Sequence, residues 1–82
     1  MADDTTWRNR ISIDPAVHHG DPCIKGTRIP VSVIVGSVAD GDTAKQIVGS
    51  YPALTIEDVQ AALRFAAEAV NRSDFVPMTT QR

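Results

Sequence analysis

The sequence TAKQIVGSYPALTIEDVQAALRFAAEAVN, residues 43–71, contains the clearest helix signals of the chain. Its first four residues, TAKQ, have the form of a capping box, in which side chains satisfy the backbone N–H groups at a helix start. Pro52 disfavours helical geometry at Tyr51 and therefore ends this first helix. Thr55 caps a second, longer helix, which we expect to end near Asn71. Two helices joined by so short a connection predict a helix-turn-helix unit.

The longer helix has an apolar face that we expect to pack on the core. Apolar side chains recur along it at helical spacing, and neighbouring alanines widen the stripe. The predicted core residues of this helix are Ile56, Val59, Leu63, Ala66 and Val70, together with Phe65.

The N-terminal part of the chain predicts a short β element. Residues 10–13 alternate between polar and apolar, which is typical of a short, half-buried strand. Ile24 and Ile29 flank a tight turn at Lys25 and Gly26, where the glycine supplies a positive φ. We therefore expect a small hairpin around this turn.

Residues 31–40 fit two kinds of secondary structure. Their valines alternate and are β-branched, which favours a strand. Pro30 suits the first position of a helix, and Gly41 suits its end, which favours a helix. The pattern alone leaves both open.

Length and charge limit the classes of protein to which this chain can belong. With 82 residues it forms one domain, and its 43% hydrophobic and 22% charged residues are typical of a soluble globular protein. Ten acidic against eight basic residues exclude a general polyanion binder. Cys23 is the only cysteine, so no intramolecular disulfide can form. We see neither a signal peptide nor a run of about 18 apolar residues, and we expect a cytoplasmic protein without a membrane partner.

Several motifs of the chain resemble domain-of-unknown-function family 433. The resemblance covers roughly residues 10–70, and the pattern G-x-P-x-I-x-G-T-R-I is unusual enough to be specific. The matching segments are ISIDP at 11–15, GDPCIKGTRIPV at 20–31, DG at 40–41, YPALT at 51–55 and VQAAL at 59–63.

The resemblance implies a mainly α, homeodomain-like three-helix domain with a short N-terminal β element, and it favours helix for residues 31–40. The expected organisation is a flexible N-terminus at 1–9, an antitoxin-like helix-turn-helix domain at 10–71 and a C-terminal tail at 72–82. Family members are regarded as antitoxins, akin to VapB-type antitoxins, whose partners are PIN-like ribonuclease toxins. The resemblance therefore implies a protein without enzymatic activity or cofactor that neutralises such a toxin.

Surplus apolar side chains predict a homodimer.

A stand-alone helix-turn-helix DNA-binding regulator is the first alternative. In such a unit the second helix enters the major groove with its N-terminal end first. Gln60 and Arg64 are then the candidate base readers, and Lys45 the candidate backbone contact. Glu57 and Asp58 would repel phosphates at that end, so we expect weak DNA binding without a partner.

The candidate partner-binding residues are Arg72, Phe75, Val76 and Met78. Basic side chains such as Arg72 can reach the acidic metal site of a nuclease. The apolar residues of the tail either order on a partner or pack back on the chain's own core. Trp7 leaves the same two alternatives open.

The remaining motif residues are expected to be structural. Arg28 either contacts a phosphate or closes the loop by binding carbonyls or a nearby carboxylate, such as Asp14 or Asp21. The structural set is Gly20, Pro22, Gly26, Thr27, Arg28, Pro52 and Leu54.

The second alternative is a small metal- or cysteine-dependent enzyme. His18, His19, Asp21 and Cys23 are of metal-binding types, but zinc sites normally need four ligands with characteristic spacing. A nucleophilic cysteine needs an orienting third group and a pocket, and the sequence indicates neither. We therefore expect no catalytic residues and no metal.

Overall fold

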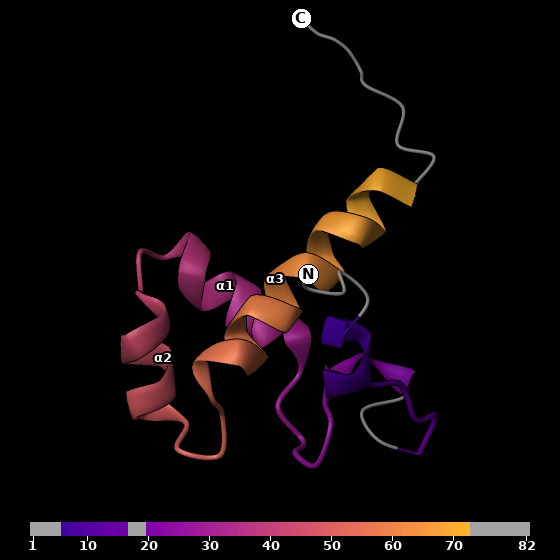
Figure 1. Cartoon of the computed structure of the whole chain (residues 1–82), viewed down its shortest axis with the longest axis horizontal. Coiled ribbons are helices and arrows are strands. Elements are labelled where there is room, and N and C mark those ends of the chain that lie inside the picture. Colours follow the sequence, from indigo (N-terminus) through magenta and orange to yellow (C-terminus); the bar gives the residue numbers. More distant parts are fainter. Residues whose placement is uncertain (1–5, 17–19, 73–82) are drawn as a thin grey trace, which may run out of the picture.

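A computed structural model describes residues 6–16 and 20–72, and Figure 1 shows their arrangement. This part of the chain is mainly helical, with three α-helices and a short two-stranded sheet, as the sequence predicts. The elements are the 3-10 helix η1 (Thr6–Arg10), strands β1 (Ile11–Ser12) and β2 (Cys23–Ile24), and helices α1 (Val31–Ala39), α2 (Ala44–Ser50) and α3 (Ile56–Arg72).

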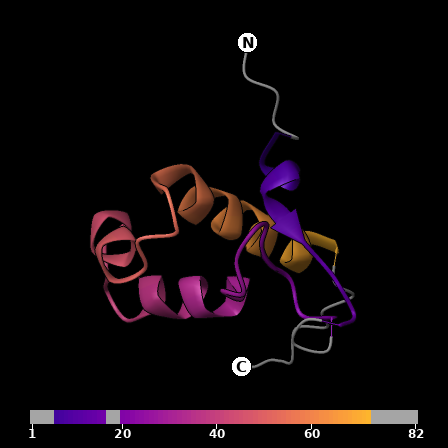
Figure 2. The same ribbon diagram turned by 90° about the horizontal axis from the view of Figure 1, so that it is seen from below.

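The longest helix, α3, organises the packing. Helices α1 and α2 contact one part of its surface and η1 contacts another (Figures 1 and 2). The core lies where α1, α2 and α3 meet, and β2 contributes one side chain to it. The fully or almost fully buried core residues are Ile24, Val31, Ile34, Ile47, Leu54, Val59 and Ala62.

Residues 31–39 are helical, which settles the ambiguity of the valine-rich stretch in favour of the family resemblance. Val31 and Ile34 are the buried residues of α1, and a spacing of three places them on one helical face. The helix ends where Gly41 takes a φ of +101° and donates its N–H to the Val38 carbonyl at 3.0 Å. A strand would place Val31 and Val33 on the same face and bury them alike. Val31 is buried, whereas Val33 is 37% exposed.

Reciprocal caps fix the starts of α2 and α3. The predicted capping box at α2 is confirmed, because the Gln46 N–H donates to Thr43 Oγ1 and the Thr43 N–H donates to Gln46 Oε1. At α3 the Asp58 N–H donates to Thr55 Oγ1 at 3.1 Å, and the Thr55 N–H donates to Asp58 Oδ2 at 3.0 Å. Both helix boundaries therefore follow from local side-chain chemistry.

The predicted core stripe of α3 is only partly correct. Val59 and Ala62 are buried, but Ile56, Leu63 and Val70 are 39%, 36% and 69% exposed. The exposed three lie on a flank of the helix outside the surface that the other elements cover. The apolar face of α3 is thus wider than the core that it contacts.

The predicted hairpin is also only partly correct. Its turn forms, but β2 pairs antiparallel with β1, with Ile11 opposite Ile24. On the other side of β2 the contact is reduced to an Ile24 N–H donating to the Ile29 carbonyl and a bridge between Cys23 and Pro30. Pro30 has no N–H to extend that ladder, so the second arm of the hairpin does not form a strand.

Substitution of Gly26 by valine should lower the free energy of unfolding by about 1–3 kcal/mol. Gly26 has a φ of +82°, and a Cβ there would meet nothing within 4 Å, so the cost is backbone strain alone. The neighbouring control, Lys25→Ala at an exposed position, should change it by less than about 0.5 kcal/mol. Thermal melts followed by circular dichroism compare the two, and equal melting temperatures would contradict the assignment.

The ends of the domain differ from the expected boundaries. Residues 6–9, expected to belong to a flexible N-terminus, lie within η1, which packs on α3. Helix α3 ends at Arg72, one residue later than expected, and residues 73–82 lie outside the described part of the chain. Among the helices within residues 6–16 and 20–72, we find none with the length and apolar character of a bilayer span.

Candidate partner-binding surface

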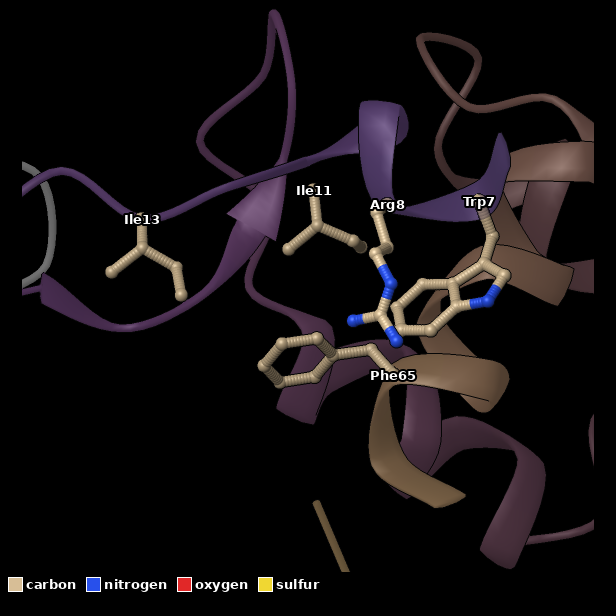
Figure 3. Close-up of a pocket in the computed structure, with 5 residues that line it drawn as sticks. All are labelled: Trp7, Arg8, Ile11, Ile13 and Phe65. Atoms are coloured by element: carbon tan, nitrogen blue, oxygen red, sulfur yellow. The ribbon is translucent and has the colours of Figure 1, made fainter. Parts of the chain in front are cut away.

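An apolar pocket lies where η1, β1 and α3 meet, and we call it the N-terminal pocket. It has a volume of about 280 Å³, and Figure 3 shows the five side chains that line it. Ile13 forms its outer wall and is 60% exposed. The lining residues are Trp7, Arg8, Ile11, Ile13 and Phe65.

Two aromatic rings and one guanidinium group define the chemistry of this pocket. Trp7 and Phe65 pack edge to face, with ring centroids 6.3 Å apart and an interplanar angle of 77°. The Arg8 guanidinium carbon lies 4.5 Å from the centre of the indole ring (Figure 3). Trp7 therefore folds back on α3, which is one of the two alternatives left open by the sequence, and it stays only partly buried.

A second apolar surface runs along α3, and we call it the outer stripe. It consists of Ile56, Leu63 and Val70. Residues seven positions apart in an α-helix drift by only about 20°, so these three side chains share one face. Exposed aliphatic side chains aligned in this way are typical of a surface that another protein covers.

A partly buried ion pair connects the N-terminal segment to the start of α3. Asp58 is only 7% exposed, and its Oδ1 accepts a hydrogen bond from Arg10 Nη1 at 3.0 Å. The Arg10 carbonyl accepts a second bond, from the Lys25 N–H at 2.7 Å. The sequence alone does not reveal this link. The spacing of Thr55 and Asp58 signals the cap, but no local pattern points to a partner 48 residues away.

This ion pair corrects one expectation about DNA. Asp58 cannot repel phosphates as expected, because its carboxylate is buried and paired, while Glu57 remains exposed. The candidate DNA-binding residues are all exposed. Gln60 and Arg64 lie one turn apart on the outward face of α3, whereas Lys45 lies near the start of α2.

The loop between β2 and α1 is held together by backbone and hydroxyl groups. The Thr27 hydroxyl donates to the Ile24 carbonyl at 2.7 Å and accepts from the Ile29 N–H at 3.0 Å. The Pro22 carbonyl accepts from the Val31 N–H at 2.9 Å. These bonds hold the loop in place between β2 and the start of α1.

The other motif residues lie in the connections between helices and strands. Gly20 has a φ of +89°, which favours glycine, and Arg28 is exposed. In the connection between α2 and α3, Pro52 is exposed, whereas Leu54 is buried and donates its N–H to the Tyr51 carbonyl at 2.8 Å. Leu54 thus anchors this connection in the core.

Of the residues considered for metal or nucleophilic chemistry, the structure describes Asp21 and Cys23. Cys23 is 3% exposed, and its Sγ lies 3.5 Å from the Asp21 carbonyl oxygen, which disfavours attack on a substrate. Within residues 6–16 and 20–72, no three His, Cys, Asp or Glu side chains are grouped as a metal site requires. His18 and His19 lie outside these residues.

Arg72 is the one predicted partner-binding residue within the described part of the chain. Its side chain is 72% exposed, and its Nε donates to Glu68 Oε1 at 3.0 Å. Phe75, Val76 and Met78 lie outside the described residues.

The sequence pattern of a family described as "Protein of unknown function (DUF433)" matches residues 11–66. The chain belongs to the DUF433 family. The matched region contains all three α-helix starts and most of the N-terminal pocket. Trp7 and Arg8 of the pocket, and Val70 of the outer stripe, lie beyond it.

Two other proteins are similar to this DUF433 member. The uncharacterized protein y4eO of Sinorhizobium fredii is 30% identical over 59 residues, which cover 72% of this chain but 27% of that protein. The chain thus spans about a quarter of the length of this curated relative. A crystal structure of a DUF433 member from Anabaena variabilis has a TM-score of 0.72 and 34% identity, and the match covers 83% of this chain and 67% of that one.

Proposed function

We propose that this DUF433 member is a cytoplasmic, antitoxin-like protein that binds and neutralises a PIN-like ribonuclease toxin without catalysing a reaction. The observation that supports a binding role is the outer stripe, where aliphatic side chains of α3 are left exposed in line. The motif resemblance supplies the class of partner.

The proposed contact extends from the outer stripe to the end of α3. Apolar side chains in the stripe supply the buried centre of an interface. Arg72 supplies a separate charged contact at the helix end, on another face of α3 from the stripe. Its guanidinium is held by Glu68, and its side chain is 72% exposed. A guanidinium there can pair with the acidic residues of a nuclease and block access of RNA.

The proposal is tested by co-expressing the full chain with a PIN-like protein encoded beside it. We expect the two proteins to co-purify and the RNA cleavage by the PIN-like protein to be suppressed at equimolar ratio. Failure to co-purify, together with undiminished RNA cleavage, would contradict the proposal. Salt-dependent binding of the isolated chain to its own upstream DNA would favour the stand-alone regulator instead.

The proposed role in transcription uses α2 and α3 as a homeodomain-like helix-turn-helix. The pairing of Asp58 with Arg10 supports it, because that pairing neutralises one of the two acids at the start of α3. Gln60 and Arg64 would then face the DNA, and Lys45 would reach the backbone. The exposed Glu57 keeps this binding weak without the toxin.

We expect the chain to be a homodimer in solution. Strand β1 has β2 on one side only within the described residues, and unpaired strand edges favour pairing with a second copy. Light scattering at tens of micromolar should give about twice the chain mass of 8.8 kDa. A monomer mass would contradict this expectation.

A further inference from the structure

We propose that the N-terminal pocket is the binding site for the chain's own C-terminal segment, with Phe75 as the anchoring side chain. This inference concerns the free protein and is independent of any toxin.

The pocket has the size and chemistry for one aromatic side chain. Its volume of about 280 Å³ lies just below the range of about 300–1,000 Å³ for small-molecule sites. Trp7 and Phe65 already pack edge to face, so a third ring can add a further contact of the same kind. Ile13 lies beside them and is 60% exposed, so a docked Phe75 ring would remove part of its apolar surface from contact with water.

The point where the tail leaves α3 lies next to the pocket. Glu68 Oε1 lies 3.0 Å from Arg72 Nε and 3.8 Å from Arg8 Nη2, so a single carboxylate joins the helix end to the pocket rim. The helix from Phe65 to Arg72 is about 10 Å long. The three residues from Arg72 to Phe75 span up to about 10 Å when extended, so Phe75 can return to Phe65.

The charge beside the anchor also fits. Asp74 directly precedes Phe75 in the sequence. The Arg8 and Arg72 side chains are 47% and 72% exposed and share Glu68, so two guanidinium groups face one carboxylate there. A second carboxylate, from Asp74, would balance the pair.

The short connection favours the chain's own tail over any other occupant. Residues 73 and 74 alone separate the end of α3 from Phe75. A tether this short gives the anchor an effective concentration in the roughly millimolar range, far above that of a free protein at micromolar concentration. Pro77 restricts the backbone of the segment and lowers the entropy lost on docking.

Trp7 makes the proposal directly measurable, because it is the only tryptophan in the chain. In the full-length protein, Phe75→Ala should uncover the indole, raise the acrylamide quenching constant of its fluorescence about twofold and shift its emission to longer wavelength. The matched control, Thr79→Ala in the same tail, should leave both unchanged. Phe75 and Thr79 follow the end of α3 at Arg72, so far-UV circular dichroism should show the same helix content in all three proteins.

Two results would overturn the proposal. Equal quenching in the Phe75→Ala and Thr79→Ala proteins would show that the tail does not cover the pocket. In a mixture of isotope-labelled and unlabelled chains, a nuclear Overhauser contact between the Phe75 ring and the Trp7 indole that crosses between two copies would place the tail of a second copy there. The same contact found within one copy would support the assignment. None of these measurements involves the toxin, so their outcome does not depend on the proposed function.

Discussion

The variant Leu63→Asp should weaken binding of the PIN-like toxin at least about 100-fold, or about 2.7 kcal/mol. Leu63 is the middle residue of the outer stripe, between Ile56 and Val70, and the centre of an interface loses water completely on binding. A carboxylate placed there would be desolvated without a partner. Titration of the toxin monitored by calorimetry, or inhibition of its RNA cleavage, measures the loss.

Val33→Asp is the matched control for this experiment. Val33 is 37% exposed, almost the same as the 36% of Leu63, but it lies on α1. Each substitution replaces a part-exposed aliphatic residue of a helix with the same carboxylate, so effects on folding should be similar. If Val33→Asp weakens toxin binding as strongly as Leu63→Asp, the outer stripe is not the specific contact.

The variant Asp58→Ala should lower the free energy of unfolding by about 2–3 kcal/mol. The carboxylate of Asp58 caps α3 through the Thr55 N–H and also accepts the charged hydrogen bond of Arg10. Alanine removes both bonds and leaves the Thr55 N–H and the Arg10 guanidinium without this acceptor. For a domain of this size the melting temperature should fall by roughly 10–15 °C.

Glu57→Ala serves as the control, because Glu57 is also an acidic residue of the first turn but is exposed. Its loss should cost no more than about 0.5 kcal/mol. Asp58→Asn should fall between the two, since an amide oxygen can still cap the helix but no longer carries the charge that Arg10 pairs with. Identical melting curves for Asp58→Ala and Glu57→Ala would show that the buried pair contributes little.

The parts of the fold that depend on neighbouring residues could be predicted from the sequence. The capping box at Thr43 and the cap at Thr55 set the starts of α2 and α3, and Pro52 set the end of the first of them. The positive φ of Gly26 was also predictable, since a tight turn between two isoleucines requires it. The helix at 31–39 needed the family resemblance, because its valines fit both periodicities.

The parts that depend on distant segments could not be predicted. Periodicity marks α3 as amphipathic but cannot tell which portion of a wide apolar face its neighbours cover, so the exposure of Leu63 was missed. The N-terminal pocket brings Trp7 and Phe65 together from opposite ends of the domain. Arg10 was assigned to the start of a strand, and nothing near it in the sequence indicates that Asp58 is its partner.

The position of Arg10 determines how small a working fragment of this protein can be. Its backbone carbonyl holds the turn at Lys25, and its side chain holds the first turn of α3. A peptide that carries only the two C-terminal helices would lack the cation that pairs with Asp58 at the start of α3. Grafting those helices onto another scaffold would therefore require a substitute for the arginine. A version of the domain that can be moved to another protein must therefore begin ahead of Arg10. The helices α2 and α3 themselves begin more than thirty residues later.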